Sequence, residues 1–69
     1  MEKTTAEKRV KAARLRVLAA NQRTMAARYR RQAAHPLYPG QDTICLDKAD
    51  QIAVLAARSE AEADLLETD

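Results

Sequence analysis

Both prolines and the single glycine of this 69-residue chain lie within residues 36–40. Proline lacks the backbone N–H that a helix needs, and glycine readily adopts turn conformations, so these residues interrupt helices. Residues 5–34 contain neither, and Ala, Arg, Leu and Gln, which favour helix, dominate there. The sequence therefore predicts one helix over about 5–34, a stiff loop over 35–42 and a second helix over about 43–67.

Two features predict where the helices begin. Thr4 and Glu7 fit a capping box, in which the side chains satisfy each other's free backbone N–H groups at a helix start. Asp42, Thr43 or Asp47 could each cap the second helix. The start of the second helix therefore stays open at this stage.

The length predicts a single all-α domain, residues 1–69, that needs additional stabilisation. A chain this short usually relies on a metal, disulfides or a partner subunit. One cysteine cannot form an internal disulfide, and one histidine leaves no zinc-ligand set, so no cofactor or metal is expected. Association with a second copy remains.

Apolar residues on the first helix form two stripes with three-four spacing. One follows Leu15, Leu18, Gln22, Met25 and Tyr29; the other follows Ala6, Val10, Ala13, Val17, Ala20, Thr24 and Ala27. At about 100° per residue the two stripes point to nearly opposite sides, so one neighbouring helix cannot cover both.

The second helix has one main apolar stripe: Cys45, Ala49, Ile52, Ala56, Ser59, Ala63 and Leu66, widened by Leu55. These patterns predict an antiparallel two-helix hairpin that homodimerises into a four-helix assembly. The residues expected in the hairpin or dimer core are Val10, Leu15, Val17, Leu18, Met25, Tyr29, Ile52, Leu55 and Leu66. Which stripe forms the dimer is left open.

Charge is strongly segregated along the chain. Residues 1–34 carry ten Lys or Arg and two Asp or Glu, a balance of +8, whereas residues 35–69 carry two and eight, a balance of −6. Four arginines, seven residues apart, form a ridge on the first helix: Arg9, Arg16, Arg23 and Arg30.

The simplest interpretation of this ridge is that it balances the acidic second helix inside the hairpin. In an antiparallel pair that turns near Tyr38, facing residues have numbers that sum to about 77. This places Arg30 near Asp47 and leaves Arg23 without an acidic neighbour, so Arg23 is expected to be the arginine most available to an outside partner. Arg31 adds to the basic face.

Leu37 and Tyr38 are candidates for partner binding, because a proline-stiffened loop loses little entropy when it binds and tyrosine is common in interface hot spots. The alternative is that the Leu-Tyr pair plugs the end of the bundle. The residues predicted to bind a partner are Tyr38, Leu37, Arg23, Arg30, Arg31, Asp42 and Asp47.

Catalysis is not expected, because the chain has no glycine-rich phosphate loop and no nucleophile–base arrangement. No apolar run is long enough to cross a bilayer, and the first residues lack the apolar core of a signal peptide, so a cytosolic location is expected. Three functional classes remain: binding of RNA or DNA through the basic helix, antagonism of another protein, and a purely structural bundle.

The chain resembles, over its full length, the quorum-sensing anti-activator carried by Pseudomonas phages. The resemblance rests on the overall layout: a capped basic helix that starts Thr4-Thr5-Ala6-Glu7, the turn His35-Pro36-Leu37-Tyr38-Pro39-Gly40, and an acidic, alanine-rich second helix. It implies a homodimer in the host bacterial cytoplasm that binds the DNA-binding domain of a LuxR-type activator and blocks promoter binding. It also implies inhibition of the type IV pilus assembly ATPase.

The expected function is therefore inhibition of a host LuxR-type transcription activator by protein contact. Acidic side chains near Tyr38, including Asp42 and Asp47, could take the place of DNA phosphates on the basic face of such a domain. The alternative is a helical-hairpin dimer that binds RNA or DNA through its basic first helix.

Overall fold

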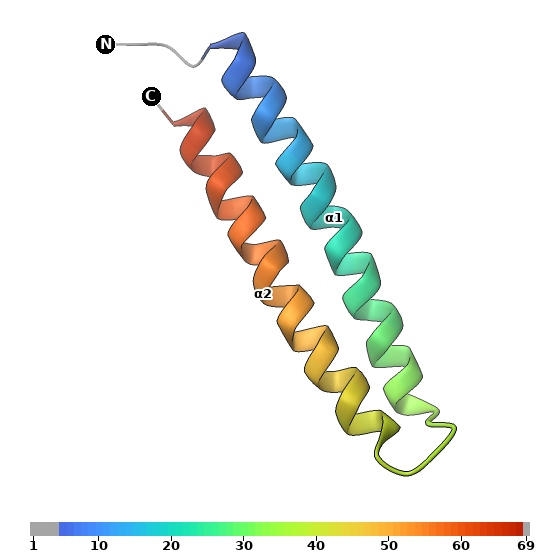
Figure 1. The fold of residues 1–69 in the computed structure, drawn as a ribbon. Coiled ribbons are helices and arrows are strands. Elements are labelled where there is room, and N and C mark those ends of the chain that lie inside the picture. The colour runs from blue at the N-terminus through green and yellow to red at the C-terminus, as the bar shows by residue number, and fades with distance from the viewer. Residues whose placement is uncertain (1–4, 69) are drawn as a thin grey trace.

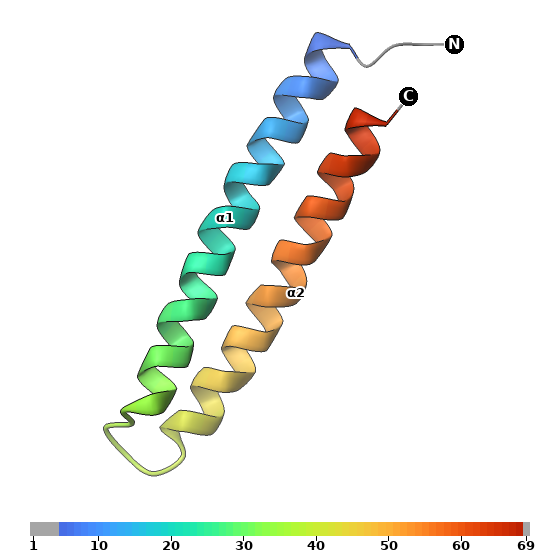
Figure 2. The same cartoon turned by 180° about the vertical axis from the view of Figure 1, so that it is seen from behind.

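The computed structural model describes residues 5–68, which form two helices, α1 (Ala6–Ala34) and α2 (Gln41–Glu67). The helices run antiparallel and side by side, with the connecting loop at one end and both chain ends at the other (Figure 1 and Figure 2). The molecule is a rod of 56 × 13 × 11 Å. The prediction of an all-helical hairpin is confirmed.

The first helix begins with a side-chain cap at Thr5. Its Oγ1 accepts a hydrogen bond of 3.2 Å from the backbone N–H of Lys8, which would otherwise have no partner inside the helix. The sequence predicted the cap at Thr4, which lies outside the described residues. α1 ends at Ala34, where the His35 N–H donates to the Gln32 carbonyl at 3.1 Å and Pro36 prevents continuation.

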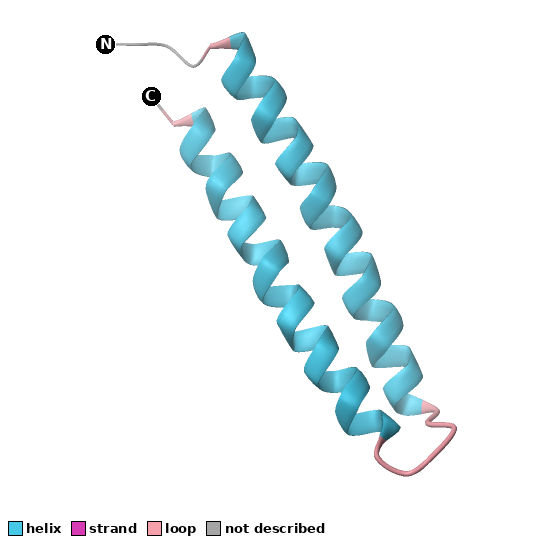
Figure 3. Cartoon of the chain, in the orientation of Figure 1, coloured by secondary structure: helices cyan, strands magenta, loops and turns pink. Residues whose placement is uncertain are grey.

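The second helix begins at Gln41, two residues earlier than predicted, and its cap is Gly40. The φ of Gly40 is 91°, a left-handed conformation that glycine adopts without steric cost, and it turns the chain directly into α2. No side chain caps this helix start. The prediction of a cap at Asp42, Thr43 or Asp47 is therefore wrong, and the loop is only the short segment 35–40 (Figure 3).

Residues that face the other helix recur every three or four positions along both helices. On α2 the least exposed positions are the predicted stripe from Cys45 to Leu66, together with Gln41, Ala53 and Glu60. On α1 they are Ala12, Leu15, Ala19, Gln22, Ala26, Tyr29 and Ala33. We call the contact line between these two sets the seam. Its three-four spacing is the pattern by which two antiparallel helices pack over a long distance.

Small side chains fill the most buried positions of the seam. The buried residues are Ala12, Ala19, Ala26, Cys45, Ala49, Ala56, Ser59 and Ala63. Within residues 5–68 no large side chain is fully buried. Alanines on both helices allow the two backbones to approach closely, so the single hairpin is held by a narrow, alanine-rich contact.

The inward side of α1 lies between the faces that the sequence pattern suggested. Ala12, Ala19 and Ala26 belong to neither predicted stripe, yet each is at most 2% exposed. The reason is steric, because a close helix pair places its smallest side chains on the contact line and larger ones beside it. Leu15 and Tyr29 lie in the seam and are half-buried, whereas Leu18 and Met25 lie beside it.

Candidate protein-interaction site at the hairpin tip

The loop at the tip of the hairpin presents two large side chains to solvent. Leu37 is 88% exposed and Tyr38 is 53% exposed. The alternative in which this pair plugs the end of the hairpin therefore does not hold for Leu37, which lies almost entirely outside the contact between α1 and α2. An exposed tyrosine side chain at a tip is the type of residue that fills a pocket on a partner.

Local bonds hold the tip in one shape. The side-chain oxygen Oε1 of Gln41 accepts a hydrogen bond from the Leu37 N–H, and the Gln41 N–H donates to the Tyr38 carbonyl at 3.2 Å. The rings of Pro36 and Pro39 fix two further backbone angles. The tip thus loses little conformational entropy on binding, which favours affinity for a partner.

Ion pairs link the two helices toward the opposite, open end of the hairpin. Arg16 contacts Asp64 at 2.9 Å and Glu67 at 3.0 Å. Arg23 binds Glu60 through two hydrogen bonds, of 2.6 and 2.9 Å. All these side chains remain substantially exposed, so each pair orients the helices more than it stabilises them.

The ion pairs shift the pKa of Arg16, Arg23 and Glu60. The hydrogen bond from Arg23 lowers the pKa of Glu60 below its ordinary value. The same bond raises the pKa of Arg23, and the hydrogen bond to Glu67, followed by that to Asp64, raises the pKa of Arg16. Arg16, Arg23 and Glu60 therefore stay charged in the hairpin near neutral pH.

The prediction that Arg23 lacks an acidic neighbour is wrong, because Glu60 lies within ion-pair distance. The facing-residue sum of about 77 describes the backbone, but helical side chains lean toward the N-terminus of their own helix. In an antiparallel pair the two side chains lean in opposite directions, so Arg23 meets a residue nearer the C-terminus of α2. Arg23 could bind an outside partner only by sharing or releasing Glu60.

Charged groups near the tip are not tied across the hairpin in this way. Within residues 5–68, Arg28, Arg30 and Arg31 form no ion pair, and neither do Asp42 and Asp47. All five are exposed. The predicted pairing of Arg30 with Asp47 is therefore absent.

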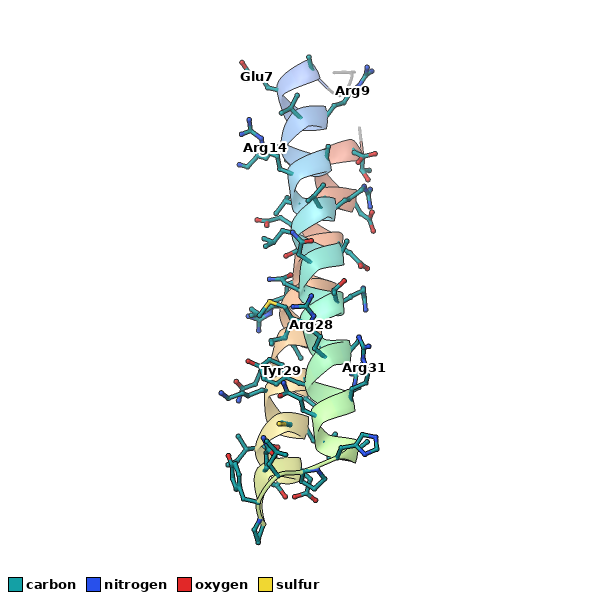
Figure 4. The ribbon with its side chains drawn as sticks, turned by 90° about the vertical axis from the view of Figure 1, so that its right-hand side faces the viewer. Glu7, Arg9, Arg14, Arg28, Tyr29 and Arg31 are labelled. Carbon is teal, nitrogen blue, oxygen red and sulfur yellow. The ribbon has the colours of Figure 1, made fainter. Side chains whose placement is uncertain are left out.

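Figure 4 shows that the arginines spread around α1 rather than along one face. Arg14 projects to the same side of the helix as Tyr29, whereas Arg9 and Arg31 project to the other side. The tip and the adjoining part of α1 consequently offer positive charge in several directions. Exposed carboxylates of α2, among them Asp42 and Asp47, add negative charge at the same end.

Most of the predicted core residues on α1 are open to solvent in the single hairpin. Val10 is 51% exposed and Val17 61%, while Leu18 and Met25 are both 46% exposed. On α2, Leu55 is 46% exposed, whereas Ile52 and Leu66 are half-buried. The contact between α1 and α2 alone therefore leaves much apolar surface uncovered.

The two sides of the hairpin differ in chemistry, a feature that inspection of single helices did not reveal. The ion pairs of Arg16 and Arg23 lie along one side of the seam. At about 100° per residue, Leu18 and Met25 lie on the other side of α1. Lys48 covers the Tyr29 ring on that other side, with its Nζ 5.7 Å from the ring centroid. Leu55 lies seven residues beyond Lys48, on the same face of α2.

Neither described helix is long and apolar enough to span a membrane. In the described part of the chain, no three His, Cys, Asp or Glu side chains gather as a metal site would require. Comparison of the chain with protein-family models, curated proteins and solved structures gives no match.

Proposed function

We propose that this chain is a small inhibitor that acts by protein contact: a homodimeric hairpin that binds the DNA-binding domain of a LuxR-type quorum-sensing activator and blocks DNA binding. The observation that carries the proposal is the exposure of Leu37 and Tyr38 on a rigid tip. A pocket-filling tyrosine on a preorganised loop suits recognition of a folded protein surface.

Charge near the tip supports a target with a basic face. Asp42 and Asp47 are exposed and form no ion pair within residues 5–68, so their carboxylates are available to lysines and arginines of a partner. A DNA-binding domain displays such cations where it meets phosphates. Carboxylates that occupy those positions would compete with DNA for the same groups and would speed association by electrostatic attraction.

The decisive experiment is pull-down of a purified LuxR-type DNA-binding domain with the full-length chain. We expect capture by the wild type and loss of capture by Tyr38→Ala. The matched control is Leu65→Ala, since Leu65 is 74% exposed but lies at the opposite end of the hairpin. Circular dichroism should show that both variants remain helical. Failure of the wild type to retain the domain would refute the proposal.

Asp42→Asn and Asp47→Asn test the role of charge in the same assay. If these carboxylates meet basic groups of the target, each substitution weakens binding at low salt, and the difference from wild type shrinks as salt rises. A salt-independent effect would show that charge attraction is not involved.

The same variants can be tested against the type IV pilus assembly ATPase, a second target that we include in the proposal, by measuring ATP hydrolysis with and without the chain.

A second candidate function is binding of RNA or DNA through α1. It is favoured by the exposed arginines that form no ion pair within residues 5–68, among them Arg14, Arg28 and Arg31. Phosphate binding of this kind weakens steeply with salt. Tight, salt-sensitive retardation of generic RNA or DNA in a gel, lost in Arg28→Ala/Arg31→Ala and kept in Tyr38→Ala, would favour this candidate over protein antagonism.

A further inference from the structure

One side of the hairpin carries most of the large apolar side chains that border the seam. We define the apolar flank as Leu15, Leu18, Met25, Tyr29, Ile52 and Leu55. Leu18, Met25 and Leu55 are each 46% exposed, and the other three are half-buried. Among residues 5–68, the side of the seam with the ion pairs of Arg16 and Arg23 has no comparable cluster.

The apolar flank follows from the periodicity of both helices. On α1 its members follow one another at intervals of three, seven and four residues, and about 100° per residue turns this stripe away from the arginine side. On α2, Leu55 and Ile52 are likewise displaced from the Glu60 side. The two displacements coincide on one side of the hairpin, and Tyr29 marks that side in Figure 4, opposite Arg9 and Arg31.

The single hairpin lacks the buried volume that a chain of this size needs. Its buried positions hold alanine, serine and cysteine, and no large side chain within residues 5–68 is fully buried. Burial of a leucine side chain contributes about 1.5–3 kcal/mol, far more than burial of an alanine. The large side chains of the apolar flank could therefore form a core, but the single hairpin only partly buries them. A partner that covers the apolar flank would complete this core.

We propose that a second copy of this chain docks on the apolar flank about a two-fold axis, which gives a four-helix bundle with the two loops at opposite ends. This proposal rests on the homodimer of the proposed function and names the surface that forms it. A two-fold interface must be complementary to itself, because if residue i of one copy contacts residue j of the other, then residue j of the first copy contacts residue i of the second. The residues of the apolar flank allow such reciprocal contacts on both helices.

On α2 the charges on either side of Leu55 are matched. Lys48 lies seven residues before Leu55 and Glu62 seven residues after it, so all three share one face of the helix. If two α2 helices pack antiparallel with their Leu55 side chains in contact, Lys48 of each copy meets the partner's Glu62. The arrangement thus forms two ion pairs, each between a lysine and a glutamate of different copies, one at either end of an apolar centre.

The same axis also fits α1. Two contacts across the seam align the helices: Cys45 Sγ lies 3.7 Å from Gln32 Oε1, and Ser59 Oγ donates to Gln22 Oε1 at 3.2 Å. Leu55 lies between Cys45 and Ser59, so it is level with about Met25 of α1. A single axis through this level therefore brings the Met25 side chains of the two copies together while it brings the two Leu55 side chains together.

Analytical ultracentrifugation of the full chain tests the surface. We expect the wild type to sediment as a dimer at micromolar concentration and Leu55→Glu as a helical monomer. The matched control is Val54→Glu, because Val54 is adjacent, 52% exposed and on another face. Val17→Glu tests the outer stripe of α1 in the same way, and we expect both controls to remain dimeric. A monomeric wild type, or a dimer broken by Val17→Glu but kept in Leu55→Glu, would overturn the proposal.

A charge swap tests the axis itself and remains decisive if Leu55→Glu fails to fold. Two exposed pairs become repulsive in Lys48→Glu, so this variant should weaken the dimer on the order of tenfold. Lys48→Glu/Glu62→Lys should restore it. Within one chain these residues are about 21 Å apart along α2, so rescue can arise only between copies. Absence of rescue would refute the axis.

These measurements need no target protein and are independent of the proposed inhibition. If the dimer follows the expected pattern but captures no LuxR-type domain, the proposed target is wrong and the proposed dimer surface stands. If the chain captured the domain but formed its dimer through another face, the proposed target would stand and the proposed dimer surface would be wrong.

Discussion

Arg23 and Glu60 form the closest charged contact between the two helices, with the guanidinium Nε 2.6 Å from one carboxylate oxygen and the second nitrogen 2.9 Å from the other. This two-pronged geometry fixes how α1 and α2 are aligned along the rod. It also joins the basic and acidic halves of the chain at a position where the sequence alone suggested no pairing.

The Arg23–Glu60 pair predicts a dependence of stability on acid. Because the pKa of Glu60 is lowered in the folded chain, the pair stabilises the fold near neutral pH, and this contribution is lost as pH falls through the folded pKa. We therefore expect Glu60→Gln to lower the melting temperature at pH 7 and to match the wild type in strong acid. Thermal unfolding followed by circular dichroism across pH 2–7 measures the difference.

Asp50→Asn is the control for this acid dependence. Asp50 is exposed and forms no ion pair within residues 5–68, so its substitution should leave the difference from wild type small at every pH. A Glu60→Gln curve that stays parallel to the wild-type curve down to pH 2 would contradict the assigned role of the pair.

The sequence predicted the architecture well because the breakers are confined to one short segment. Two long runs without proline or glycine leave little alternative to two helices, and the stripe from Cys45 to Leu66 identified the inward side of α2. The inward side of α1 was harder to predict. Hydrophobic periodicity gives weight to Leu and Met, whereas a close helix pair selects alanine, so Ala12, Ala19 and Ala26 went unrecognised.

The candidate site could be predicted only in part. Exposure of Leu37 and Tyr38 at the tip agrees with the expectation from a proline-stiffened loop. The partner of Arg23 could not be inferred, because it depends on the lean and reach of side chains rather than on backbone alignment. The apolar flank could not be predicted either, because it depends on how the two helices are aligned. Only this alignment shows that Leu18 and Leu55 lie on the same side of the hairpin.

Gly40 predicts a graded effect of substitution at the loop. Its φ of 91° is costly for residues with a Cβ, although no atom lies within 4 Å of the place a Cβ would take. Gly40→Ala should therefore lower the free energy of unfolding by about 1 kcal/mol through backbone strain alone. Gly40→Asn should lose less, because asparagine tolerates this conformation better. Chemical denaturation at one fixed protein concentration measures both, and equal losses would argue against strain.

Thr5 predicts the effect of removing a helix cap. Thr5→Ala deletes the oxygen that accepts the Lys8 N–H and should cost about 0.5–1 kcal/mol of unfolding free energy. The control is Thr24→Ala, because the Thr24 hydroxyl bonds only to the Ala20 carbonyl within the same helix. That substitution should be neutral or slightly stabilising, since alanine favours helix more than threonine does. Equal destabilisation by both variants would show that capping is not the cause.

The alanine seam predicts that enlargement of one buried side chain forces the helices apart. Ala56 is fully buried at the contact with α1, so Ala56→Leu has no space for its added carbons and should lower the free energy of unfolding by about 1–3 kcal/mol. Ala57→Leu adds the same atoms at an exposed neighbour and should change stability little. If Ala56→Leu proved as stable as Ala57→Leu in urea denaturation, the helices could not be packed as closely as the small residues of the seam allow.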